Sequence, residues 1–248
     1  MEIERNQFLT VLSESLHCVE KEVFGITDHH AKRVAWLCIQ MGKKAGMDEK
    51  DISDMAVAAL LHDNALNEFR EDYENRKPRP GVSGKNHCMA GERNLHCIPG
   101  CEDMRDFVLY HHECADGSGP FGITEDETPL GAQIIHLADD VDLQFSLGDY
   151  KADDYESLYS YVIAHSGTLF SKQVIDLFLC ILKTSTLEEI SNENIEGQTL
   201  EIMPLYISAD RGIAELFAHI IDYKSPFTKE HSVGLAEKAG RMANYYGF

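Results

Sequence analysis

The sequence has no long hydrophobic run and little positive charge. Its 248 residues include 22 Lys and Arg against 42 Asp and Glu, which gives a formal net charge of −20. Nucleic acids and anionic membranes attract positively charged proteins, so we expect neither as a partner. The longest apolar runs, 55–61 and 177–182, are far shorter than the about 20 residues that cross a bilayer, and the charged start MEIERNQF does not resemble a signal peptide. We therefore expect a cytoplasmic protein.

Signs of disulfide bonding are also absent. The seven cysteines are odd in number and include no CxxC pair, so we interpret them as reduced thiols that mostly fill the core. One cluster could suggest structural zinc: His87, Cys88, His96, Cys97 and Cys101. It lacks the second ligand pair that is usual in such sites, so we do not favour this interpretation.

Strand-like alternation is scarce, and 200–208 is the only tract that could form a short strand. Apolar residues instead recur at spacings of three and four, which predicts helices. The first runs from His30 to a stop at Gly46, and the second is capped by Asp48 and reaches His62. Further helices are expected at 86–95, 102–112, 129–145, 153–165, 171–183, 209–223 and 229–246. The fold class is therefore all-α.

The placement of the histidines suggests chemistry. Five histidines and two aspartates lie near the ends or inward faces of five expected helices: His30, His62, Asp63, His87, His111, His112 and Asp139. Taken singly, each could be a helix cap, a surface residue or an ordinary exposed acid. Helical bundles, however, build metal sites from side chains of facing helices. Mixed imidazole and carboxylate ligands suit iron, manganese or zinc.

The order H…HD…H…HH…D resembles the HD superfamily of metal-dependent phosphohydrolases, and specifically its HD-GYP branch. The resemblance covers about residues 1–185, and its most specific part is the stretch HHE-x-x-DGSG that begins at His111. The matching segments are 30–35, 59–63, 87–92, 111–119, 129–139 and 167–178.

This resemblance implies an HD-domain helical bundle that cleaves cyclic di-GMP or a related cyclic dinucleotide with two or three metal ions. It assigns the first metal to His30, His62, Asp63 and Asp139, and the second to His87, His111 and His112, with Asp63 bridging both. Two cations can clamp a phosphodiester and generate a metal-bound hydroxide as nucleophile. Asp63 is therefore the side chain to which we assign a catalytic role.

The same resemblance implies a cofactor and a substrate loop. We expect two transition-metal ions, with iron or manganese favoured and zinc also suitable. Substrate contacts are expected from the glycine-rich loop of Asp116, Gly117, Ser118 and Gly119. A phosphoester ligand remains compatible with the acidic chain, because metal ions supply positive charge locally.

Five positions depart from the HD-GYP pattern. Leu66 replaces the lysine of HD-x-G-K, and the tripeptide GYP reads Gly-Pro-Phe at 119–121. Cys114 stands where arginine commonly follows HHE, and Ile26 replaces the glutamate of trinuclear members, so we expect two metals. The expected metal ligands are therefore complete, whereas the substrate site is altered.

The tail carries a second resemblance. Residues 221–236 are similar to the opening of another HD-GYP domain, with His231 in the role of His30 but without the later ligands, so we do not expect His231 to bind metal. We divide the chain into a metal-binding domain at 1–185, a linker at 186–208 and a C-terminal helical extension at 209–248. The extension could begin a downstream HD-GYP domain or act as a connector helix, and it could also mediate a homodimer.

Three functions remain open. The first is a binuclear phosphodiesterase of a cyclic dinucleotide, and the second is a regulatory domain that keeps metal or nucleotide binding without turnover. The third is an HD phosphohydrolase of another nucleotide, such as a nucleotide monophosphate. The complete ligand set favours an enzyme. Leu66, Pro120 and the incomplete second domain favour the regulatory function.

Overall fold

The computed structural model describes residues 2–66, 84–98, 100–101, 104–150, 155–182, 186–195, 200, 206–208, 238 and 241–242. Within them the fold is all-α, as predicted, with one pair of very short strands. The elements are β1 (Glu2–Glu4), α1 (Arg5–Phe24), α2 (His30–Ala45), α3 (Glu49–Leu60), α5 (Lys85–Leu95), α6 (Leu130–Phe145), the 3₁₀ turn η2 (Leu147–Asp149), α7 (Tyr155–Ala164), α8 (Lys172–Leu182), α9 (Thr186–Glu189), α10 (Asn192–Ile195) and β2 (Tyr206–Ser208).

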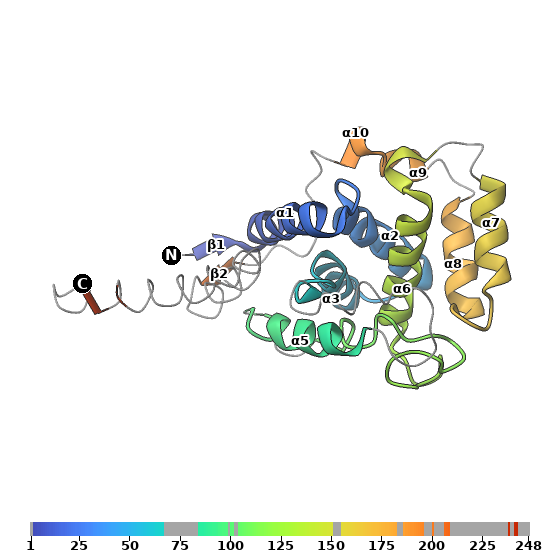
Figure 1. Cartoon of the computed structure of the whole chain (residues 1–248), viewed down its shortest axis with the longest axis horizontal. Coiled ribbons are helices and arrows are strands. Elements are labelled where there is room, and N and C mark those ends of the chain that lie inside the picture. The colour runs from blue at the N-terminus through green and yellow to red at the C-terminus, as the bar shows by residue number, and fades with distance from the viewer. Residues whose placement is uncertain are drawn as a thin grey trace.

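Helix α2 is the central element of the bundle. It packs against α1, α3, α6 and α8, and α6 in turn packs against α3 and α8 (Figure 1). Most residues of α2 are buried, so the helix is surrounded on nearly all sides. Its buried lysine and arginine are paired: Lys32 Nζ lies 2.6 Å from Glu14 Oε1, and Arg33 Nε lies 2.6 Å from Asp142 Oδ1.

The turn between α2 and α3 follows the predicted capping signals. Gly46 ends α2 in a left-handed conformation at φ 69°, and its N–H bonds back to the last turn of the helix. Asp48 caps α3 by accepting a hydrogen bond from the N–H of Asp51. Gly42 lies against α3, where a Cβ would come within 2.8 Å of Cε at the flexible end of Met55. The packing of α2 on α3 holds His62 and Asp63, which directly follow α3, beside α2.

Two segments differ from the sequence expectations. Helix α1 was not predicted, although its apolar residues Leu9, Leu12 and Leu16 recur at helical spacing and are buried. The helix expected at 102–112 is wrong in its described part, where 106–112 forms turns. Two features account for this: Asp106 has φ 54°, and the Leu109 N–H bonds to the carboxylate of Glu92, 17 residues earlier in the chain, in place of a backbone carbonyl.

The segment after α8 returns to the start of the chain. β2 pairs antiparallel with β1, with Tyr206 opposite Glu4, so the short strand expected within 200–208 forms. Leu187, Ile190 and Ile195 are buried in the core of the bundle. The helices expected at 209–223 and 229–246 lie almost entirely outside the described residues. Among the described helices, none is long and apolar enough to cross a membrane.

Candidate metal centre

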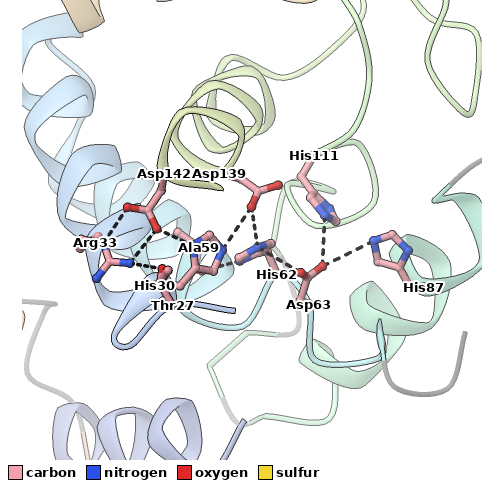
Figure 2. A network of polar contacts seen from close by, with 10 residues as sticks. All are labelled: Thr27, His30, Arg33, Ala59, His62, Asp63, His87, His111, Asp139 and Asp142. Atoms are coloured by element: carbon pink, nitrogen blue, oxygen red, sulfur yellow. Dashed lines mark hydrogen bonds and ion pairs between the residues drawn. The ribbon is translucent and has the colours of Figure 1, made fainter. Parts of the chain in front are cut away.

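The seven predicted ligands lie close together, and all of them except His112 are drawn in the row of polar contacts in Figure 2. At one end His30, at the start of α2, has its Nε2 3.2 Å from Asp139 Oδ1 on α6. Asp139 Oδ1 is also 3.5 Å from Nε2 of His62, just beyond the end of α3. These three side chains, the first cluster, are buried, and their ligand atoms lie within 4.8 Å of one another.

At the other end of the row, His87 on α5 and the pair His111-His112 form a second cluster. These three residues and Cys88 have ligand atoms within 4.8 Å of one another. His87 and His111 are buried, whereas His112 is half-buried. Five separate segments, from α2 to α6, thus deliver imidazole or carboxylate groups to one place, and this convergence is what a protein metal site requires.

Asp63 lies between the two clusters. Its Oδ2 is 3.5 Å from Nε2 of His62, while its Oδ1 is 3.6 Å from Nε2 of His87 and 3.8 Å from Nε2 of His111. One carboxylate therefore faces the first cluster with one oxygen and the second cluster with the other (Figure 2). This is the arrangement that a bridging ligand requires.

Three of the histidines are oriented through their second ring nitrogen. Nδ1 lies 2.8 Å from the Ala59 carbonyl oxygen in His62, and 2.6 Å from the Val108 carbonyl oxygen in His111. A carbonyl only accepts, so Nδ1 carries the proton and Nε2 presents a lone pair. Nε2 of both rings is buried and has no hydrogen-bond partner among the described residues. Metal-binding histidines are oriented in this way, so the residues fit a metal ion.

The orientation of His30 depends on a buried ion pair that sequence reasoning missed. Its Nδ1 lies 2.7 Å from Asp142 Oδ2. Arg33 donates to the same carboxylate through Nε at 2.6 Å and through its terminal nitrogen at 2.9 Å. Asp142 lies three residues after Asp139 on α6, so both carboxylates face α2. This spacing of three residues on one helix is the sequence pattern that could have indicated Asp142 as a partner of His30.

The two ends of the row differ in electrostatics. Burial alone would lower the pKa of His30, but the carboxylates of Asp139 and Asp142 raise it to about 10. Burial lowers the pKa of His111 to about 4, and the neighbouring His87 and His62 rings add to this although Asp63 opposes it. The two carboxylates therefore favour the protonated form of His30, whereas burial favours the neutral form of His111.

Two further polar residues hold the segments of the site in place. Asn64 donates to the carbonyl oxygens of Leu61 and Gly91, at 2.8 and 3.1 Å, and thereby ties the end of α3 to α5. Glu92 on α5 accepts the Leu109 N–H at 2.9 Å, which fixes the turn before His111. Neither was singled out in the sequence, because contacts between distant segments leave no periodic pattern.

The predicted substrate loop is folded around Glu113. Its buried carboxylate accepts the N–H groups of Phe121 and Ile123, at 2.6 and 3.0 Å. Gly119 is required there, since a Cβ would lie 2.7 Å from Glu113 Cα. Asp116 Oδ1 accepts the Ser118 N–H at 2.9 Å, so this carboxylate shapes the loop itself. The hydrogen bonds to Ser118 lower the pKa of Asp116.

The departures from the HD-GYP pattern have clear structural settings. Leu66 is fully buried in the core, so its position does not present a side chain to solvent. Phe121 packs edge-on against Tyr110, and Lys85 Nζ lies 4.8 Å from the centre of its ring.

The cysteines are less buried than expected: Cys38, Cys88 and Cys101 are core residues, whereas three others are exposed. Cys97, a member of the discarded zinc cluster, is one of the exposed three.

Comparison with protein families decides the assignment. Residues 27–144, which span α2 to α6, match the family model of the HD domain. Just under half of the chain therefore matches an HD domain. The predicted resemblance to the HD superfamily is confirmed, and the matched span includes all seven candidate ligands.

Curated relatives of this HD-domain chain act on cyclic dinucleotides. The chain is 25% identical to the 3′3′-cGAMP-specific phosphodiesterase 1 of Vibrio cholerae, over 95% of the chain and 58% of that protein. It is 29% identical to a cyclic di-GMP phosphodiesterase of Thermotoga maritima, over 74% of the chain and 52% of that protein. The chain thus spans somewhat more than half the length of these relatives.

A solved structure has the same fold. The crystal structure of the cyclic GMP-AMP specific phosphodiesterase V-cGAP3 of V. cholerae matches with a TM-score of 0.74 and 17% identity, over 94% of this chain and 63% of that chain. This likeness confirms the HD-domain helical bundle.

Proposed function

We propose that this chain is a metal-dependent phosphodiesterase that hydrolyses a cyclic dinucleotide, cyclic di-GMP or a related molecule. The observation that carries the proposal is the position of Asp63 between two buried histidine clusters. Such a carboxylate can hold two cations close together, and paired cations are the usual catalysts of phosphodiester hydrolysis. The names of the relatives supply the substrate class.

The residues divide the work as follows. His30, His62, Asp63 and Asp139 would hold one cation, and His87, His111 and His112 the other, with Asp63 shared. Iron or manganese suits these donors, and zinc is also suitable. When bound, the cations would supply Lewis acidity toward the phosphodiester and toward the water that attacks it. Asp63 and the histidines orient this chemistry, and no side-chain nucleophile is needed.

Recognition of the substrate would come from the loop at 116–119 and its surroundings. Gly119 and Glu113 hold the loop in one conformation next to His112. Lys85, at the start of α5, is exposed and lies over Phe121 of this loop. A lysine there brings positive charge to an otherwise acidic protein, and this charge suits a doubly anionic ligand.

One observation favours a second function. The position of the HD-GYP lysine holds Leu66, which is fully buried, so no phosphate contact can come from there. A domain with an intact metal centre and a weakened substrate site could bind nucleotide without turnover and regulate another domain. A downstream HD-GYP domain or a second copy of the chain would be the partner.

Turnover separates the two functions. Protein reconstituted without oxygen with Fe(II) or Mn(II) should hydrolyse cyclic di-GMP or 3′3′-cGAMP, and an Asp63→Asn variant should not. A nucleotide monophosphate serves as the third substrate, because its hydrolysis alone would point to another HD phosphohydrolase. Metal-loaded protein that binds a cyclic dinucleotide but leaves it intact would replace the enzyme with the regulatory domain.

A further inference from the structure

The start of α5 places an exposed lysine over an aromatic ring. Lys85 is the first residue of the helix, and no carboxylate of the described residues forms an ion pair with it. Its Nζ lies 4.8 Å from the centre of the Phe121 ring. An ammonium group within about 6 Å of the centre of an aromatic ring is attracted to the face of that ring. Phe121 therefore holds the lysine side chain in one place without cancelling its charge.

The ring of Phe121 is itself fixed relative to the second cluster. Its backbone N–H donates to Glu113 Oε1 at 2.6 Å, and Glu113 directly follows the candidate ligand His112. The ring also packs edge-on against Tyr110, with 5.4 Å between the two ring centres. The ring, and with it the lysine, is thereby tied to the segment that carries His112.

The backbone next to Lys85 lies against the same cluster. A Cβ at Gly84 would lie 3.0 Å from Cδ2 of His112 and 3.4 Å from Cε1 of His87. Lys85 follows Gly84 directly and precedes His87 by two residues. His112 is half-buried and Lys85 is exposed, so this side of the cluster is open to solvent. A ligand at the second cluster would therefore lie within reach of the lysine side chain.

We propose that Lys85 binds a phosphate group of the cyclic dinucleotide beside the second cluster, and that Phe121 positions it for this contact. The ammonium group has three N–H donors, and the ring face occupies one side of it only. The formal net charge of −20 disfavours an anionic ligand, so a fixed cation at this place favours binding. This inference rests on the proposed function and names the side chain that contacts phosphate.

Stopped-flow fluorescence with labelled cyclic di-GMP and labelled 3′3′-cGAMP tests the proposal, because it measures binding before any hydrolysis. The metal-loaded full chain is compared with Lys85→Met, Lys85→Arg, Phe121→Leu and the double variant of Lys85→Met and Phe121→Leu. Lys44→Met is the matched control, since it also removes one exposed positive charge but lies at the far end of α2 from His30.

Lys85→Met should weaken the binding of both dinucleotides about 10–100-fold and to the same extent, because the two ligands share their phosphates and differ in one base. Lys85→Arg should keep most of the affinity, and Lys44→Met should leave it unchanged. Phe121→Leu should weaken binding about 2–5-fold. In the Lys85→Met background Phe121→Leu should add no further loss, which a purely structural role of the ring would not produce. Bound metal should stay unchanged in every variant.

Three results would overturn the proposal and leave the proposed function standing. Unchanged affinity in Lys85→Met would show that the lysine does not touch the ligand, and unequal losses for the two dinucleotides would show that it contacts a base. Loss of metal from Lys85→Met would show that the lysine supports the metal centre instead. A further loss in the double variant would overturn the positioning role of Phe121. Metal-loaded wild type that binds neither dinucleotide would overturn the proposed function as well.

Discussion

The two histidine clusters contain different kinds of side chain, although they share Asp63. In the first cluster the His30 ring lies between two carboxylates of α6, Asp139 and Asp142, and Arg33 neutralises Asp142. The second cluster gathers three imidazole rings and a thiol, with Asp63 as its nearby carboxylate. The first cluster is therefore held by its own buried ion pairs, whereas the second is held by weaker contacts among rings and a thiol beside Asp63. We expect the second cluster to depend more strongly on bound metal.

The largest effect should come from removing the residue that the clusters share. Asp63→Ala should lose both metal ions together, since each cluster is left without its common carboxylate. His87→Ala should lose the second metal ion and retain the first. Metal content after gel filtration, measured by elemental analysis, checks both expectations.

An isosteric variant guards against simple misfolding. Asp63→Asn keeps the shape of the side chain but not its charge, so a helical circular dichroism spectrum with little bound metal is the expected result. Equal metal content in Asp63→Ala and His87→Ala would show that Asp63 is not a bridge.

The next largest effect should come from removing the charge of Asp142, the carboxylate that pairs with Arg33 and orients His30. Asp142→Asn leaves the Arg33 guanidinium buried without a counter-charge, which should cost about 3–5 kcal/mol of unfolding free energy in the metal-free protein. His30 also loses its partner, so affinity for the first metal ion should fall about 10–100-fold. Urea denaturation and metal titration measure the two quantities separately.

A double variant distinguishes lost charge balance from lost packing. Arg33→Met combined with Asp142→Leu removes both charges and keeps apolar bulk, so much of the lost stability should return. The weak first metal site should not recover, because neither new side chain can accept a hydrogen bond from His30. Recovery of both properties would contradict the role given to Asp142.

The sequence predicted the metal ligands better than the residues that hold the ligand-bearing segments in place, and the reason is physical. His62-Asp63 and His111-His112 carry their chemistry in neighbouring residues, and capping residues such as Asp48 act on the next few N–H groups. Asn64 and Glu92 instead act on segments 17–27 residues away. Their side chains matter only after folding, so their role is invisible in a linear pattern. The wrong helix at 102–112 has the same origin, because Glu92 takes the N–H that a helix would have used.

Removing the metal ions should lower the free energy of unfolding, and it should loosen the segments of the second cluster more than those of the first. At free metal 100 times the dissociation constant, each bound ion adds about 2.7 kcal/mol of stability, or about 5–10 °C in Tm for a chain of this size. A chelator should therefore lower Tm, and added metal should restore it. Hydrogen exchange should accelerate more in α5 and 106–112 than in α2. Equal acceleration of hydrogen exchange in both regions would show that the second cluster does not depend on metal more than the first.

The smallest effect lies outside both clusters, in the loop next to the second. Gly119→Ala forces a Cβ to within 2.7 Å of Glu113 Cα, so the loop must shift and the free energy of unfolding should fall by about 1–3 kcal/mol. The metal ligands are not touched, and metal content should stay unchanged. Affinity for a cyclic dinucleotide should fall, which isothermal titration can measure.

Asp126→Ala is the matched control, since Asp126 is an exposed residue that follows the same loop. Its stability should stay within about 0.5 kcal/mol of wild type, with nucleotide affinity unchanged. If Gly119→Ala lost metal along with nucleotide, the loop would be part of the metal centre. If it lost neither, the loop conformation held by Glu113 would not matter for the ligand, and recognition would have to come from residues such as Lys85 on α5.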